Sequence, residues 1–289
     1  MCELAGVSRA SYYRERENGA GPEGDTELRD QIQKTALRYR KYGYRRIIEV
    51  LRREGCNASQ HRIRDLLRKD NLLAVRKRKF VVTTRRDKHF LVYPNLAERL
   101  ELTDINQLWV ADITYIWLKN EFVYLAVILD SFSRRVVGWA LRRDLRASLP
   151  LAALRKAFEE RQPGPGLVHH SDQGSQYACH DYINMLEKKE AYPSMSRPAR
   201  PWENARCERF MKTLKEEQID ARQYADLAEL EQHTAEFIDQ FYNRHRLHSA
   251  LGYRSPEEFE QKVARERPAQ VMPAGMSFLR HKEIYPDVH

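Results

Sequence analysis

The chain has 289 residues, of which 42% are hydrophobic and 31% are charged, and its formal net charge is +9 at pH 7. This composition predicts a buried core and excludes a disordered chain. The longest apolar run, 122–129, is too short to cross a bilayer, and no secretory signal opens the sequence, so we expect a cytoplasmic protein with no membrane partner. The four cysteines form no Cys-x-x-Cys pair, which argues against a zinc ribbon.

The positive charge is concentrated in the first third of the chain. Residues 1–100 carry 24 basic and 13 acidic side chains, whereas residues 101–289 carry 26 basic and 28 acidic ones. A basic segment joined to a near-neutral remainder suggests a module that binds a polyanion, attached to a second domain with another task.

The basic third predicts short helices. Residues 1–24 are expected to form an N-terminal helical segment that ends in a linker, because NGAGPEG at 18–24 interrupts any regular element. Residues 25–75 follow as three helices, with caps expected at Asp25 or Thr26 and at Ser59. Three short helices joined by tight turns are typical of a helix-turn-helix DNA-binding domain, although a plain helical bundle with solvated charges has the same pattern.

Basic side chains that lie off the apolar helix faces are the candidates for DNA contact. A second group of cations lies in an extended stretch at 76–88, and we interpret 76–104 as a basic linker lying along a duplex. Such a strip can neutralise phosphates and release counterions. The candidates are Arg45, Arg46, Arg62, Arg64 and Arg68 in the helices, and Arg76, Lys77, Arg78 and Lys79 in the strip.

The remaining two-thirds predicts strands followed by alternating helices and strands. The order β-β-β-α-β-α-β-α indicates an α/β fold in which a mixed sheet is flanked by helices, as in the ribonuclease H-like fold. We assign residues 105–262 to this core and 263–289 to a loosely ordered C-terminal tail. The expected strands span 108–117, 122–130, 135–143, 167–171 and 191–195, and the expected helices span 148–161, 174–190 and 203–218.

Three acidic residues stand out by their positions in these elements. Asp112 lies in the middle of an apolar strand, where an unpaired acid is costly. Asp172 ends the fourth strand, and Glu208 lies on the helix after the last strand. Three carboxylates from separate elements are hard oxygen ligands that suit Mg²⁺ or Mn²⁺ and not Zn²⁺. Taken alone, Glu208 is better explained as an ordinary surface charge or a local salt bridge, whereas the buried position expected for Asp112 argues against that explanation.

Four further polar residues are candidates for DNA contact near these acids. Lys212 and Lys215 share a helix face with Glu208 and are placed to hold phosphates, although ordinary exposed lysines show the same spacing. Asn243 and Arg246 follow a helix rich in apolar residues. They either face DNA or fix the C-terminal loop of the core through structural contacts.

The spacing and the surrounding motifs resemble a known family. Asp112 and Asp172 are separated by 59 residues, and Asp172 and Glu208 by 35, like the catalytic Asp-Asp-Glu residues of transposases and retroviral integrases. The segments WVADITYI, HSDQGSQY, WENARCERFMKTLKEE and YNRHRLHSALGYRSPEEFE are similar to those of the OrfB transposases of the IS-three insertion-sequence family. GVSRASYYR and YGYRRIIEVLRREG resemble the start of those proteins. The loop SRPARPW at 196–202 departs from the family pattern, which leaves its DNA contacts open.

The resemblance implies an activity and a set of partners. It implies a DNA transposase in which Asp112, Asp172 and Glu208 hold two Mg²⁺ ions, with Mn²⁺ as a substitute. Water first cuts at a transposon end, and the freed 3′-hydroxyl then attacks a second phosphodiester, so that DNA integration proceeds through a circular intermediate. The implied partners are double-stranded DNA (terminal inverted repeats and target), further copies of the chain on that DNA, and an upstream-frame (OrfA) product or fusion.

Two other functions share part of this pattern. A sequence-unspecific nuclease of the same fold would release cut DNA without any joined product, and it would not need the basic first third. A non-catalytic DNA-binding descendant of a transposase would not need the three acids, all of which are present here.

Overall fold

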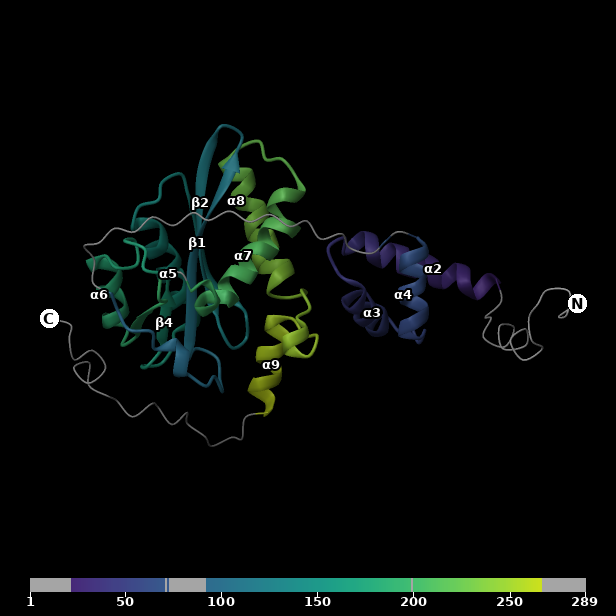
Figure 1. Ribbon diagram of the computed structural model, residues 1–289, viewed down its shortest axis with the longest axis horizontal. Helices are drawn as coiled ribbons and strands as arrows, with labels where there is room; N and C mark the ends of the chain where they lie inside the picture. Colours follow the sequence, from purple (N-terminus) through teal and green to yellow (C-terminus); the bar gives the residue numbers. More distant parts are fainter. Residues whose placement is uncertain (1–21, 71, 73–91, 199, 267–289) are drawn as a thin grey trace, which may run out of the picture. The chain divides into compact units, whose positions relative to one another are not determined.

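The computed structural model describes residues 22–70, 72, 92–198 and 200–266 (Figure 1). The chain divides into two compact units, Met1–Phe80 and Val81–His289, which are described separately below. The N-terminal segment before residue 22, the cationic strip at 76–88 and the tail after residue 266 lie outside the described residues.

The described part of the first unit contains three helices that pack on one another. They are α2 (Pro22–Arg38), α3 (Tyr44–Arg53) and α4 (Gln60–Lys69). Ser59 caps α4, as predicted, because its hydroxyl accepts a hydrogen bond of 3.3 Å from the backbone N–H of Arg62. The core is formed by apolar positions at helical spacing on each element: Ile32, Ala36, Ile47, Leu51, Ile63 and Leu67.

The start of α2 differs from the prediction. The helix begins at Pro22, so the cap expected at Asp25 or Thr26 and the end of the linker expected at residue 24 were both wrong. Proline at the first helical position is favourable, because its fixed φ suits the helix and its missing N–H would have no helical partner there.

The second unit is built on a five-stranded sheet. Its strands are β1 (Leu108–Leu118), β2 (Glu121–Asp130), β3 (Val136–Arg142), β4 (Val168–Ser171) and β5 (Tyr192–Met195). Their order in the sheet is β3-β2-β1-β4-β5. The pairs β1–β2 and β2–β3 are antiparallel, and the pairs β1–β4 and β4–β5 are parallel. This mixed sheet confirms the predicted ribonuclease H-like fold.

Helices cover both faces of the sheet (Figure 1). On one side lie α5 (Ser148–Arg161) and α6 (His180–Lys188), and on the other lie α7 (Ala205–Glu217) and α8 (Leu227–Ala235), which continues as a π-helix over Glu236–Tyr242. The two cores on the two faces explain why β2 is apolar through most of its length. Gly138 permits the close packing of α5 on β3, since a Cβ there would lie 2.3 Å from the carbonyl oxygen of Ala153.

Two helix boundaries in this unit also differ from the prediction. The helix expected from residue 174 begins only at His180, because 172–179 form turns after β4. The helix expected from residue 203 is preceded by a 3₁₀ turn over Pro201–Asn204. Short 3₁₀ segments also occur at Ala97–Arg99, Ile219–Ala221 and Ser249–Leu251.

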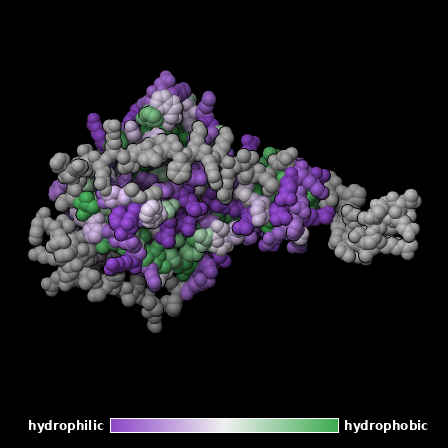
Figure 2. Space-filling model, in the orientation of Figure 1, coloured by the Kyte–Doolittle hydropathy of each residue, from purple (hydrophilic) through white to green (hydrophobic). Residues whose placement is uncertain are grey.

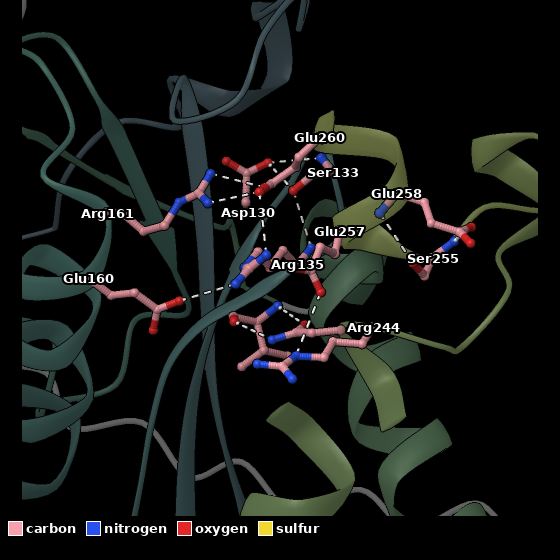
Figure 3. A network of polar contacts seen from close by, with 12 residues as sticks. Asp130, Ser133, Arg135, Glu160, Arg161, Arg244, Ser255, Glu257, Glu258 and Glu260 are labelled. Atoms are coloured by element: carbon pink, nitrogen blue, oxygen red, sulfur yellow. Dashed lines mark hydrogen bonds and ion pairs between the residues drawn. The ribbon is translucent and has the colours of Figure 1, made fainter. Parts of the chain in front are cut away.

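The last described helix, α9 (Pro256–Glu266), corrects the expected end of the core at residue 262. The helix runs past that boundary, and it is held to the sheet unit by a buried ion pair. Two guanidinium nitrogens of Arg161, on α5, donate hydrogen bonds of 2.8 and 2.9 Å to the Glu260 carboxylate (Figure 3). Among the described helices, none combines the length and the apolar character needed to cross a membrane.

Candidate active site

Asp112 lies at the centre of β1, and its side chain is half-buried. Its carboxylate accepts a hydrogen bond of 2.8 Å from the backbone N–H of Ile113. Beyond Val110, β1 has no pairing with β4, so Asp112 is the second residue past the end of the parallel ladder. An acid at this position can reach the space beside the end of β4.

Asp172 immediately follows β4, and its side chain is also half-buried. Its carboxylate accepts a hydrogen bond of 3.0 Å from the backbone N–H of Gly174. In the parallel register Val110 pairs with His170, so Asp112 and Asp172 both lie two residues beyond the same pair. Neighbouring strands lie about 4.8 Å apart, which brings the two acids to the same level of adjacent strands.

Glu208 is in the first turn of α7, and its side chain is exposed. Cys207, Phe210 and Leu214 bury the opposite side of the helix in the sheet core, as the helical period predicted. Asn204, the residue before α7, donates a hydrogen bond of 2.9 Å to the carbonyl oxygen of Ala111. This contact fixes the start of the helix next to the strand residue that precedes Asp112.

Asp112 lies within electrostatic reach of both other acids. Burial, followed by the charge of Asp172 and to a smaller extent that of Glu208, raises the pKa of Asp112 to about 7. Burial also raises the pKa of Asp172 and that of Glu208. Within the described ranges, none of the three carboxylates forms a salt bridge. The charge of Lys215 lowers the pKa of Asp112 but does not reverse the rise, so a cation bound there would favour the ionised acids.

The donor set suits a hard divalent cation, although the side chains do not form a finished cage. In the part of the chain that the structure describes, no three His, Cys, Asp or Glu side chains are close enough together to hold a metal ion as they stand. Two of the acids are held only through backbone N–H groups, and the third is exposed. Each retains carboxylate oxygens that could bind Mg²⁺ or Mn²⁺.

Lys215 and Lys212 have different surroundings on α7. Lys215 is half-buried, and its ammonium nitrogen lies 4.7 Å from the ring centre of Tyr115 on β1. Burial lowers the pKa of Lys215, whereas the nearby charges of Asp220 and Asp112 act in the opposite direction. Lys212 is exposed and lies 3.8 Å from Glu216 in a helical ion pair. Lys215 is thus the lysine that lies near the acids.

Asn243 and Arg246 make internal contacts, which favour the structural one of the two roles that the sequence left open. The amide of Asn243 is buried and exchanges two hydrogen bonds of 3.0 Å with the backbone of Val136, at the start of β3. Arg246 is buried and donates hydrogen bonds of 2.9 and 2.7 Å to the Glu217 carboxylate. The alternative reading, in which they fix the C-terminal part of the core, agrees with these contacts.

Two further residues shape the site. Asn204 shares a helix face with Glu208 by the helical period, which was the signal for it in the sequence, whereas Glu203 was missed. The Glu203 carboxylate accepts hydrogen bonds from the backbone and the guanidinium of Arg197, both at 2.7 Å, and from the amide of Asn95 at 2.9 Å. Glu203 thereby anchors the described part of the loop at 196–202 in front of α7. In the sequence, the available signal for this role was the acidic residue Glu203 directly before Asn204.

The candidate DNA contacts of the first unit remain predictions. Arg45 and Arg68 are exposed, while Arg46, Arg62 and Arg64 are half-buried. Arg45 donates to the Tyr44 hydroxyl at 3.2 Å. The four cations Arg76, Lys77, Arg78 and Lys79 lie outside the described residues.

Known protein families match nearly the whole described chain. The integrase core domain family matches residues 103–201, a second integrase core domain family matches residues 190–256, and the HTH-like domain family matches residues 23–80. The two integrase matches together contain all three acids, and the HTH-like match contains α2, α3 and α4 up to their ends.

Curated relatives match over most of their length. The 31 kDa protein of insertion element IS600 from Shigella sonnei is 36% identical over 266 residues, which cover 91% of this chain and 98% of the relative. The transposase of insertion sequence IS904 from Lactococcus lactis is 37% identical and covers 76% and 88% of the two chains. Transposase InsF of IS3A from Escherichia coli is 30% identical and covers 91% and 93%. The chain therefore belongs to the family of insertion-sequence transposases that have an HTH-like domain followed by an integrase core.

Proposed function

We propose that Asp112, Asp172 and Glu208 are the metal ligands and catalytic carboxylates of this transposase. The observation that carries the proposal is the placement of Asp112 and Asp172 at the same level of two adjacent strands. Burial and the two other acids raise the pKa of Asp112 to about 7, which supports it, and none of the three acids forms a salt bridge within the described ranges. Mutually repelling carboxylates at the end of strands are the arrangement that a divalent cation relieves.

The chain's own residues have separate tasks in this proposal. Asp112 and Asp172 present oxygens from adjacent strands, and Glu208 closes the set from α7. Two bound Mg²⁺ ions, or Mn²⁺ in their place, would supply the charge that stabilises the attacking and leaving oxygens of a phosphodiester. The Asn204 contact with Ala111 keeps α7, and hence Glu208, in place beside β1. Lys215 lies near the acids and is suited to hold a DNA phosphate there.

The substrate side of the proposal concerns DNA ends. The match of the HTH-like family to residues 23–80 and the net positive charge of the first third support double-stranded DNA as the partner. We propose that the terminal inverted repeats of the insertion sequence are recognised by this first unit, that cleavage frees a 3′-hydroxyl, and that the hydroxyl attacks a second strand. Further copies of the chain on the DNA and an upstream-frame product belong to the same proposal.

Isosteric variants test the triad directly. Asp112→Asn, Asp172→Asn and Glu208→Gln each remove one charge at nearly constant volume. We expect each to lower cleavage and joining by more than about 100-fold, the upper range for residues that merely support metal ligands. The measurement follows labelled end DNA with Mg²⁺ on a sequencing gel, while filter binding confirms that DNA affinity is retained.

The exposed acid Asp239, on the π-helix, gives the matched control. Asp239→Asn should cut and join at the wild-type rate. Normal joining by any one of the three triad variants would refute the assignment. Cut DNA from the wild-type chain without any joined species, under conditions with intact ends and target, would instead indicate the nuclease alternative.

A further inference from the structure

Three exposed aromatic rings lie together on the hairpin formed by β1 and β2. The exposed fractions are 37% for Tyr115, 59% for Trp117 and 47% for Phe122. The Phe122 ring meets Trp117 edge-on at a centroid distance of 4.6 Å and Tyr115 edge-on at 5.6 Å. Large apolar side chains that cluster on a surface indicate a binding site more strongly than scattered ones do.

The hairpin carries these rings beyond the covered part of the sheet. Trp117 pairs directly with Phe122 across the two strands, so both side chains and Tyr115 project from the same face. β4 does not reach this level, because it pairs with β1 only up to Val110. β3 ends opposite Tyr124, the partner of Tyr115, and therefore stops short of Trp117 and Phe122. The projecting end of the hairpin is visible in Figure 1, and Figure 2 shows green and pale side chains there among purple ones.

Cations flank the rings on two sides. The Lys215 ammonium nitrogen lies 4.7 Å from the Tyr115 ring centre, and the same lysine is within electrostatic reach of Asp112. Arg142 lies opposite Tyr124 on the same face of the sheet, and it forms no salt bridge to a described residue. The acid at this end, Glu121, is engaged by Arg143 at 3.1 Å. Aromatic rings next to cations suit a nucleic acid, because bases stack on the rings and the cations attract the negative phosphates.

The distance from the acids sets which part of the DNA can reach the rings. Along a strand the rise is about 3.3 Å per residue, so the backbones of Tyr115 and Trp117 lie roughly 10 and 17 Å from that of Asp112. At a rise of about 3.4 Å per stacked nucleotide, this corresponds to roughly three to five nucleotides. The Asp112 side chain projects from the other face of β1, so a DNA strand that reaches both the rings and Asp112 passes around the edge of β1 that β4 leaves open beyond Val110. The faces of bases are hidden in a duplex, so stacking on these rings requires unpaired nucleotides.

We infer that Tyr115, Trp117 and Phe122 form a stacking platform for unpaired nucleotides of a DNA end, a few positions from the phosphodiester that reacts. The inference rests on the proposed function, which places that phosphodiester at the three carboxylates. The platform holds a frayed strand and thereby keeps the end open next to the acids. It is a positioning site, and none of the three rings touches the reacting atoms.

Binding without metal tests the platform separately from catalysis. The full chain, in chelator, is titrated with end duplexes that are blunt or carry four unpaired nucleotides on either strand, with 2-aminopurine at the third unpaired position. We expect tighter binding of one overhang form than of the blunt form, together with quenching of the 2-aminopurine fluorescence by stacking. Trp117→Ala should weaken binding of that overhang by about 5- to 150-fold and abolish the quenching, while blunt-duplex affinity changes less than about twofold.

Matched variants distinguish stacking from a general loss of apolar surface. Trp117→Phe keeps a ring and should retain most of the overhang preference. Val92→Ala removes an exposed apolar side chain elsewhere in the same unit and should change nothing. The melting temperature of each variant is measured first to confirm that it is folded. Quenching by the wild-type chain tests the platform without the use of any variant.

Several outcomes would overturn the platform. The first is an absence of overhang preference and of quenching in the wild-type chain. The second is equal weakening of blunt and overhang binding by Trp117→Ala. The third is a changed oligomeric state of Trp117→Ala with unchanged overhang binding, which would show that a second copy of the chain covers the rings. Normal cleavage and joining without overhang preference would refute the platform alone. Overhang preference without metal-dependent joining would refute the proposed catalytic role alone.

Discussion

Two regions of the second unit bury charged side chains, and they treat those charges in opposite ways. In the region around α9, shown in Figure 3, Glu260 is held by Arg161 at 2.8 Å and lies 3.7 Å from Arg135, which also lies 3.5 Å from Glu160. At the centre of β1 and directly after β4, Asp112 and Asp172 are half-buried and form no salt bridge with a described residue.

The difference separates a stabilising role from a functional one. A buried charge costs free energy, and a partner at good geometry offsets that cost. The α9 region meets this requirement within the chain, so its charges hold the last helix and the sheet together. The carboxylate region has no such partner within the described residues. The free-energy cost of its ionised acids therefore remains until a cation binds or a carboxylate takes up a proton. Strongly perturbed carboxyls without a partner are typical of functional sites.

Breaking an internal ion pair should have the largest effect on stability. Arg246 and Glu217 form such a pair outside the α9 region, with side chains that are only 5% and 10% exposed, and Arg246→Ala leaves the Glu217 carboxylate without its bidentate partner. Removing one partner of a buried pair typically costs about 3–5 kcal/mol, and we expect a loss of that size in the free energy of unfolding. Urea denaturation followed by circular dichroism measures it.

Arg244 provides the control two residues away. Its side chain is 54% exposed and lies 3.7 Å from Glu257. Because exposed pairs contribute little, Arg244→Ala should change the free energy of unfolding by less than about 1 kcal/mol. Equal losses in the free energy of unfolding of Arg246→Ala and Arg244→Ala would contradict the distinction between a buried ion pair and an exposed one.

Neutralising the unpaired region should act in the other direction. The pKa of Asp112 is about 7 in the folded chain, against an ordinary value of 3.8. The folded chain therefore holds the proton more tightly than the unfolded chain does, and its stability falls as the pH rises from about 4 through about 7. Asp112→Asn removes this penalty and keeps an acceptor for the Ile113 N–H.

We expect metal-free Asp112→Asn to be more stable than the wild type by about 2–4 kcal/mol at pH 8, with the gap closing as the pH is lowered towards 4. Urea denaturation at pH 8, 6 and 4 in chelator measures the gap. Asp239→Asn, at an exposed position, should show no such pH-dependent gain. A variant that is no more stable than the wild type at pH 8 would show that the Asp112 charge is already compensated.

Adding a divalent cation should make the carboxylate region resemble the paired one. A ligand that binds only the folded state at 100 times its dissociation constant adds about 2.7 kcal/mol. Mg²⁺ or Mn²⁺ should therefore raise the melting temperature of the wild type and leave that of Asp112→Asn and Asp172→Asn nearly unchanged. Differential scanning fluorimetry across a metal titration measures this without any DNA. Equal shifts in all three proteins would place the cation elsewhere.

The sequence predicted the sheet and the three acids because local signals carry them. The runs of apolar residues in β1 and β2 and the acid inside β1 are visible in the sequence without tertiary information. α5 begins and ends at the residues that the sequence predicted, before the helix-breaking segment PGPG. The roles of Asn243 and Arg246 were not predictable in this way. Their partners, Val136 and Glu217, lie 107 and 29 residues away, and only the folded chain shows that these polar groups are satisfied internally.

Helix ends and the aromatic platform needed the structure for a different reason. α2 begins at Pro22, before the polar residues Asp25 and Thr26 that looked like caps in the sequence, although proline is itself favourable at the first helical position. Tyr115, Trp117 and Phe122 look in sequence like ordinary strand residues, since β-strands favour aromatic side chains. Their exposure follows from the lengths of β3 and β4, which stop before this end of the hairpin and are set by the whole sheet.

The smallest predicted effect concerns a charge that is neither buried nor paired. Arg68 lies in the last turn of α4, is exposed and has no acidic partner among the described residues, whereas Arg29 in the same unit is engaged by Asp70 at 2.5 Å. An exposed cation costs little when it stands alone, so Arg68→Ala should leave the free energy of unfolding within about 0.5 kcal/mol of the wild type. If Arg68 contacts a phosphate, its loss should lower the slope of log affinity against log salt by about 1, and it should do so equally for end and scrambled duplexes. Lys34, which lies 2.6 Å from Asp30 on α2, is the control whose replacement by Ala should leave the slope unchanged. A loss confined to end duplexes would mean that Arg68 reads base edges instead of the backbone, and an unchanged slope would remove α4's last turn from the DNA-binding surface.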